Sequence, residues 1–182
     1  MGTLRNSACV VACAGSLGLG CSEPVLGDYP VDVPGADEGT AAATCMEGEL
    51  ERAIRPPRDG AVHIVEWMAN PSGPDDDLEW VEMRFDEDAD LNGVALGPTL
   101  ESAVVVVGGG DCVPVDAGSW VVFGASPAAA PRVDAELPFS LANTGPRSIV
   151  AAFDGATLDR VDYEGSVEGV SAQLDDDGVR CE

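Results

Sequence analysis

The side chains that most often perform chemistry in proteins are scarce in this sequence, which has one histidine, His63, and no lysine. Zinc sites with several histidines are therefore excluded within one chain, because each needs more than one imidazole. A phosphate-binding loop that ends in Gly-Lys is excluded by the missing lysine. We predict that His63 is a half-exposed strand residue, that the chain has no catalytic residue, and that it needs no cofactor.

Carboxylates are abundant, and many of them occur in short runs that look like loops. The runs are Asp75–Asp77, Asp86–Asp88 and Asp175–Asp177. A glycoside hydrolase needs two carboxyl groups at a defined separation across a cleft, so the residue types leave a stand-alone hydrolase open as an interpretation. Acidic runs between strands are typical of solvated turns, and that is our prediction for them.

The alternation of Asp86, Asp88 and Asp90 is similar to the start of a helix–loop–helix calcium site. That site needs a glycine at its sixth position and a bidentate glutamate at its twelfth. The corresponding residues here are Leu91 and Gly97, so we predict no metal site of this kind. An irregular cation site at the loop tips is the alternative.

The charge balance of the chain excludes one class of partner. Nine Arg against 33 Asp and Glu give a formal net charge of −24, whereas nucleic-acid binding depends on cationic side chains that neutralise phosphates. An anionic bilayer surface is disfavoured for the same reason. We therefore expect no nucleic-acid partner, and we expect the acidity itself to favour solubility and self-repulsion.

Residues 1–20 have the composition of an export signal. One positive charge, Arg5, precedes the small and apolar run 8–20, which is shorter than the roughly 20 residues that a membrane-spanning helix needs. The end of this run resembles a bacterial lipoprotein signal, in which cleavage precedes a cysteine that receives lipid. The resemblance implies lipid attachment at Cys21, and Ser22 after it implies sorting to the outer membrane. An ordinary signal cleaved nearby is the alternative.

The other cysteines predict at least one disulfide. Cys9 and Cys13 would leave with the signal, whereas Cys45, Cys112 and Cys181 would enter an oxidising compartment, where pairing is expected. Cys112 lies in a turn-like loop and Cys181 at the tail, so their pairing is our first choice. One thiol is then left over.

Composition divides the remaining chain into a spacer, 21–58, and one domain, 59–182. The spacer is rich in Pro, Gly, Ala and acids without periodicity, which predicts a flexible segment with at most a turn or two of helix at Glu47–Ile54. The domain has short apolar runs separated by turn formers such as Asp154-Gly155, the pattern of an all-β sandwich or barrel. The predicted strands are 63–68, 79–85, 94–96, 103–107, 119–123, 139–141, 148–152, 158–163 and 170–174.

All three tryptophans lie within these apolar strands, namely Trp67, Trp80 and Trp120. Large rings dominate the burial of apolar surface in cores, so we predict that all three are core residues. A sugar-stacking platform is the alternative.

The order and spacing of several segments between Ala61 and Leu174 resemble those of a lamin tail domain. The segments are 64–71, 79–82, 90–96, 117–123, 139–143, 158–163 and 169–174. The resemblance implies an immunoglobulin-like β-sandwich. It also implies an accessory role, because bacterial members of that family occur on exported and surface proteins, alone or beside hydrolases and nucleases.

These patterns together predict a non-catalytic cell-surface lipoprotein module that contacts an envelope protein or a polysaccharide, or contributes to envelope architecture. The alternative is an accessory fragment of a surface hydrolase or nuclease system. We expect export to the outer membrane or the cell surface, with membrane contact through the lipid on Cys21.

Overall fold

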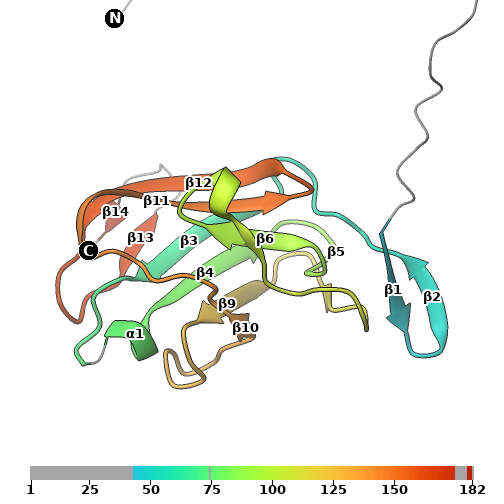
Figure 1. Cartoon of the computed structure of the whole chain (residues 1–182), viewed down its shortest axis with the longest axis horizontal. Helices are drawn as coiled ribbons and strands as arrows, with labels where there is room; N and C mark the ends of the chain where they lie inside the picture. The colour runs from blue at the N-terminus through green and yellow to red at the C-terminus, as the bar shows by residue number, and fades with distance from the viewer. Residues whose placement is uncertain (1–42, 74, 175–179, 182) are drawn as a thin grey trace, which may run out of the picture. The chain divides into compact units, whose positions relative to one another are not determined.

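The computed structural model describes residues 43–73, 75–174 and 180–181, and these residues form an all-β fold (Figure 1). The predicted signal with its Cys21, residues 22–42 of the predicted spacer and the acidic run 175–177 lie outside the described residues. Besides strands, the described residues form a short helix, α1 (Asp75–Leu78), and a 3₁₀ turn, η1 (Leu100–Ser102). The strands are β1 (Thr44–Glu47), β2 (Leu50–Ala53), β3 (Val62–Met68), β4 (Trp80–Phe85), β5 (Ala89–Asp90), β6 (Val94–Gly97), β7 (Val104–Val105), β8 (Pro114–Val115), β9 (Trp120–Gly124), β10 (Ala135–Glu136), β11 (Thr144–Phe153), β12 (Ala156–Gly165), β13 (Ala172–Leu174) and β14 (Arg180–Cys181).

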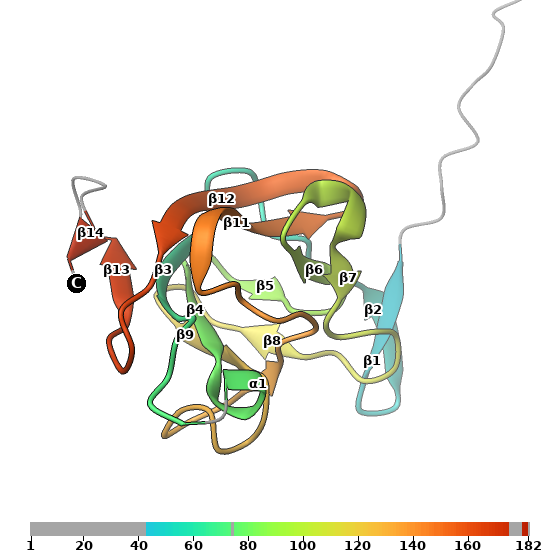
Figure 2. The same cartoon turned by 60° about the vertical axis from the view of Figure 1, so that its left-hand side comes forward.

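Two sheets pack face to face and enclose one hydrophobic core (Figures 1 and 2). The six-stranded sheet has the order β10-β9-β4-β3-β13-β14, and the four-stranded sheet has the order β12-β11-β6-β7. Neighbouring strands of both sheets are antiparallel except for the parallel pair β10–β9. The prediction of an all-β fold is therefore confirmed.

Strand alternation decides which side chains enter the core. In β4 the buried residues alternate, namely Val81, Met83 and Phe85. In β3 a register shift between Ile64 and Glu66 adds one residue, so that Ile64 and Trp67 are both buried. The ring of Trp67 lies 5.7 Å, centroid to centroid, from the ring of Tyr163 in β12. This contact joins the two layers.

The prediction that all three tryptophans are core residues is confirmed only for Trp67, which is 1% exposed. Trp80 is half-buried, and Trp120 is 46% exposed. Trp80 faces outward because the next residue of β4, Val81, faces inward, and Trp120 shares that outer face as the cross-strand partner of Arg84. The prediction is wrong for Trp120 because strand alternation overrides the preference of a large ring for the core.

A β-hairpin, β1–β2, occupies part of the predicted spacer. The prediction of a flexible spacer is therefore wrong for residues 44–53, and so is the prediction of a turn of helix at Glu47–Ile54. Gly48 has a φ of 65°, which favours glycine and allows the tight turn between the two strands. Cys45 is the one buried residue of these two strands, so the hairpin depends on contacts with the rest of the domain.

Cys45 supplies one such contact, because it forms a disulfide with Cys112. The prediction that Cys112 pairs with Cys181 is therefore wrong. The hairpin explains the observed pairing: the N–H of Met46 donates to the carbonyl of Gly110 at 2.8 Å, and the N–H of Cys112 donates to the carbonyl of Met46 at 2.8 Å. These backbone bonds hold the two cysteines beside each other, and sequence spacing alone gave no sign of them.

The longest strands, β11 and β12, form a hairpin that is closed by Asp154 and Gly155. Both residues have positive φ, 48° and 74°, as a two-residue turn of type I′ requires. The turn predicted at this Asp-Gly pair is thus confirmed. The strand predicted at 139–141 is wrong, because this segment is irregular and instead places Leu141 in the core.

Candidate ligand-binding groove

The outer face of the six-stranded sheet gathers polar side chains from neighbouring strands. Alternation in β4 turns Glu82 and Arg84 outward on either side of the buried Met83. The cross-strand partner of Glu82 in β3 is Glu66, and the partner of Arg84 in β9 is Trp120. Directly opposite and diagonal partners are close enough to interact on a sheet face, so these four side chains form one surface.

A groove of about 530 Å³ lies over this surface, and we call it the Trp120 groove. Its lining consists of Val65, Glu66, Glu82, Arg84, Trp120, Gln173 and Leu174. Trp120 is the aromatic residue of the lining and is 46% exposed. An exposed tryptophan among hydrogen-bonding side chains in a hollow is typical of surfaces that contact a partner.

The electrostatics of the groove are unfavourable for its two acids, because Glu66 and Glu82 place like charges opposite each other. Burial raises the pKa of Glu82 above its usual value, and the charge of Glu66 raises this pKa further. The positive charge of Arg132 lowers the pKa of Glu82. The Nε of Arg132 donates at 2.6 Å to the carboxylate of Asp134, and the negative charge of Asp134 partly cancels the effect of Arg132 on that pKa. Neither Glu66 nor Glu82 forms an ion pair in the described part of the chain.

Arg84 is neutralised within the same face. Its Nε donates to Oδ1 of Asp86 at 2.9 Å, and this guanidinium holds the pKa of Asp86 below its usual range. Oδ2 of Asp86 lies 3.0 Å from Nε2 of His63. Among the described residues no hydroxyl or thiol forms a hydrogen bond with this imidazole. His63 is a half-exposed residue of β3, as predicted.

The two acids of the groove, Glu66 and Glu82, stand side by side on one sheet face as cross-strand partners in β3 and β4. Glu66 also accepts a hydrogen bond from Oγ of Ser171, which fixes its orientation. The groove can therefore accept hydrogen bonds and bind positive charge.

The acidic run that imitates a calcium loop binds groups of the chain itself. Glu87 forms an ion pair with Arg58, and Asp88 accepts a hydrogen bond of 2.8 Å from the N–H of Ala117. No cluster of three or more His, Cys, Asp or Glu side chains in the described ranges is suited to hold a metal ion. The run is thus only partly a solvated turn, because its carboxylates attach neighbouring segments to each other.

Asp90, the last acid of this series, is fully buried and attaches the hairpin to the sandwich. The guanidinium of Arg52 in β2 donates two hydrogen bonds to it, of 2.6 and 2.9 Å. Arg55 donates from its backbone N–H at 2.7 Å and from its side chain at 3.2 Å. The Arg52 guanidinium is the main cause that holds the pKa of Asp90 well below its usual range.

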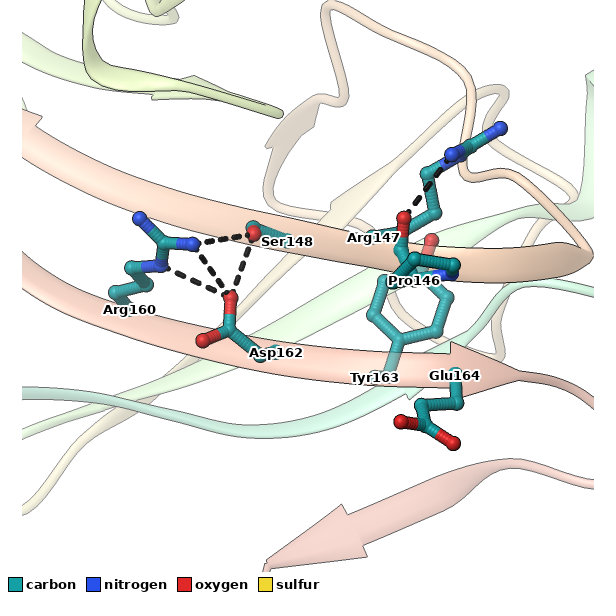
Figure 3. A pocket seen from close by; sticks show the side chains of 7 residues that line it. All are labelled: Pro146, Arg147, Ser148, Arg160, Asp162, Tyr163 and Glu164. Carbon is teal, nitrogen blue, oxygen red and sulfur yellow. Dashed lines mark hydrogen bonds and ion pairs between the residues drawn. The ribbon is translucent and has the colours of Figure 1, made fainter.

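A second hollow, of about 800 Å³, lies over β11 and β12 (Figure 3). Nε of Arg160 donates to Oδ1 of Asp162 at 2.9 Å, and Oγ of Ser148 donates to the same oxygen at 2.6 Å. Arg160 also donates to Oγ of Ser148 at 2.9 Å, so the three side chains form a closed triangle. Arg147 points away from this triangle, toward the carbonyl of Pro146 (Figure 3). In this hollow Arg160, Asp162 and Ser148 satisfy one another by hydrogen bonds.

The structure thus brings Trp120, which the sequence placed in the core or on a sugar-stacking platform, together with Glu66, Glu82 and Arg84, which the sequence did not single out. Cys21 lies outside the described residues, Cys112 is in the disulfide, and Cys181 belongs to β14. The alternation of side-chain types in residues 80–85 predicted that the polar side chains of β4 point outward. The pairing of these side chains with Glu66 depends on the register shift in β3, for which the sequence gives no signal.

None of the described helices has the length and apolar composition that a membrane span requires. Comparisons with protein-family models, with curated proteins and with solved structures found no match to this chain. Function is therefore argued from the geometry of the site, since fold class alone does not specify it.

Proposed function

We propose that this chain is a non-catalytic cell-surface module whose sandwich contacts an envelope protein or a polysaccharide. The observation that carries the proposal is the exposed Trp120 in an open groove, beside Glu66, Glu82 and Arg84. Exposed rings of this size are enriched at contact surfaces, where a partner covers them. Regular strands of one sheet hold these side chains, so the surface is preorganised for a partner.

We also propose that the sandwich is immunoglobulin-like and of the lamin tail type. Two mainly antiparallel sheets packed over one core support this proposal. It is further supported by the position of the resembling segments 64–71 and 79–82, which contribute β3 and β4, adjacent strands within the six-stranded sheet.

The proposed location is the outer membrane or cell surface, with a lipid on Cys21. The signal-like run 8–20 and its terminal cysteine support this proposal. Replacing Cys21 by Ala should move the protein from the membrane fraction to the soluble fraction, and mass spectrometry of the native protein should find lipid on Cys21. An unmodified N-terminus at another residue would contradict the anchor.

Two measurements test the contact function. Immobilised protein should retain a component of envelope extracts, and Trp120→Ala should retain less of it. The protein should also be inert toward nuclease, phosphatase, esterase and glycosidase substrates, with or without calcium, magnesium or zinc. Reproducible turnover that is lost in Glu82→Gln, with the fold preserved, would show instead that the chain is an enzyme.

A further inference from the structure

We propose that the Trp120 groove binds an arginine or lysine side chain of a partner protein, with the cationic group against the Trp120 ring and its N–H groups donating to Glu66 and Glu82. This inference rests on the proposed contact function and names the chemistry of the partner.

The first support is a negative charge in the groove that the nearby arginines compensate only in part. The two nearby arginines each have a carboxylate of their own, because Arg84 pairs with Asp86 and Arg132 pairs with Asp134. The two groove acids are left facing each other, and the raised pKa of Glu82 reflects burial and this like charge. A bound cation would remove the repulsion, whereas a neutral ligand would leave it in place.

The second support is the position of the tryptophan. Trp120 is the diagonal cross-strand neighbour of Glu82, because its direct partner Arg84 is two residues along β4. Such diagonal residues lie roughly 7–8 Å apart, within reach of aromatic and long side chains, so one guanidinium or ammonium group can contact both the ring and the carboxylate. Tryptophan is the aromatic ring that attracts cations best.

The charge of the chain favours a basic protein as the source of this cation. A net charge of −24 attracts cationic partners over long range and repels anionic ones. Arg and Lys are the cationic groups that proteins carry at neutral pH. Trp120 lies in an open groove on a sheet face, where another protein surface can reach it, and tryptophan is enriched among residues that dominate protein interfaces.

The test uses a nine-residue peptide with three arginines and a second peptide with citrulline at the same positions, which keeps the shape and removes the charge. Binding to the purified full chain is measured by calorimetry and by the shift of the Trp120 indole N–H resonance. The arginine peptide should bind at least about tenfold more tightly than the citrulline peptide. Trp120→Ala should weaken binding about 2- to 30-fold, and Glu82→Gln about fivefold.

Glu164→Gln is the matched control, because it removes the same charge from an exposed position at the other hollow. Binding by this variant should stay within about twofold of wild type. If all three variants bind the arginine peptide equally, the peptide binds to general surface charge and the inference is overturned. It is also overturned if the peptide does not bind, or if a neutral polysaccharide competes at Trp120. Glu82→Gln preserves side-chain shape and keeps the test valid should Trp120→Ala fail to fold.

The outcome separates this inference from the function on which it rests. If wild type and Trp120→Ala retain the same envelope component equally, the Trp120 groove is the wrong site but the contact function stands. If wild type retains no component, the contact function itself fails.

Discussion

The outer faces of the two sheets use similar side chains in opposite ways. On the four-stranded sheet, Arg160, Asp162 and Ser148 form a closed hydrogen-bonded triangle across β11 and β12 (Figure 3). On the six-stranded sheet, Glu66 faces Glu82 across β3 and β4. Arg160 and Asp162 are opposite charges two residues apart in β12, and both bond to Ser148 of β11. Glu66 and Glu82 are like charges directly opposite each other, an arrangement that destabilises a sheet.

The difference indicates where to look for function. A like-charge pair beside an exposed tryptophan contributes nothing favourable to folding, whereas a cationic partner would offset both features. The triangle around Asp162 needs no partner, although its hollow is the larger of the two. The two hollows therefore differ in the surroundings of their acids, because Asp162 has Arg160 beside it whereas Glu82 faces Glu66.

The largest effect on stability is expected in the hydrophobic core, which both sheets share. Trp67→Ala removes the ring that packs on Tyr163 between the layers, and a core truncation of this kind costs about 3–5 kcal/mol of unfolding free energy. Chemical denaturation followed by circular dichroism measures this cost. Trp80→Ala is the comparison, because a half-buried ring on the outer face should cost less. Equal losses in the two variants would contradict the placement of Trp80.

A smaller effect is expected at Asp90, where opposite charges pair in a buried site. Asp90→Asn leaves Arg52 and Arg55 without their carboxylate, and because both arginines are partly exposed the cost should be about 1–3 kcal/mol at pH 7. The folded pKa of Asp90 lies below the unfolded value of about 3.9. Its stabilisation is therefore present above that value and is lost progressively as pH falls below it.

Urea unfolding between pH 7 and pH 3 measures this dependence. The difference in stability between wild type and Asp90→Asn should stay constant down to about pH 4 and shrink below it. Asp116→Asn, at an exposed position, is the control and should change stability little. A difference that grows on acidification would contradict the pairing of Asp90 with Arg52.

The sequence predicted the strands better than it predicted the site. Alternation and turn residues located β3, β4, β9 and the β11–β12 hairpin, because these signals are local. The β1–β2 hairpin was missed because it exposes most of its residues and is held by a disulfide and by Asp90. Those partners lie 38 to 67 residues away, so no local pattern reveals them.

The Trp120 groove was missed for a related reason. Which face of a strand is outward depends on pairing register, and one extra residue reverses every later side chain. The shift between Ile64 and Glu66 places Trp67 inward and brings Glu66 opposite Glu82. The sequence showed three tryptophans in apolar runs, but only the register separates Trp67 from Trp120.

The smallest effects on stability are expected on the outer faces of the two sheets, and they should have opposite signs on the two faces. Glu82→Gln removes an ionised carboxylate that burial and the like charge of Glu66 disfavour, and it should raise the free energy of unfolding by about 0.2–1 kcal/mol at pH 7. Asp162→Asn breaks an exposed triangle with Arg160 and Ser148 and should lower it by about 0.2–1 kcal/mol. Both variants replace one carboxylate by an amide, so the sign reports the surroundings of the acid and not the substitution. Thermal unfolding at low salt measures both.

The pH dependence shows whether the gain in Glu82→Gln comes from the ionised carboxylate, which burial and the charge of Glu66 both disfavour. The groups that act on Glu82 are Glu66, Asp134 and Arg132, and Arg84 lies two residues along β4. A raised folded pKa means that the ionised form is disfavoured in the folded state, so the penalty exists above that pKa. It disappears as pH falls toward the unfolded value of about 4.3. The gain in Glu82→Gln should therefore shrink on acidification, and a gain that is constant from pH 7 to pH 4 would show that repulsion in the groove is not its source.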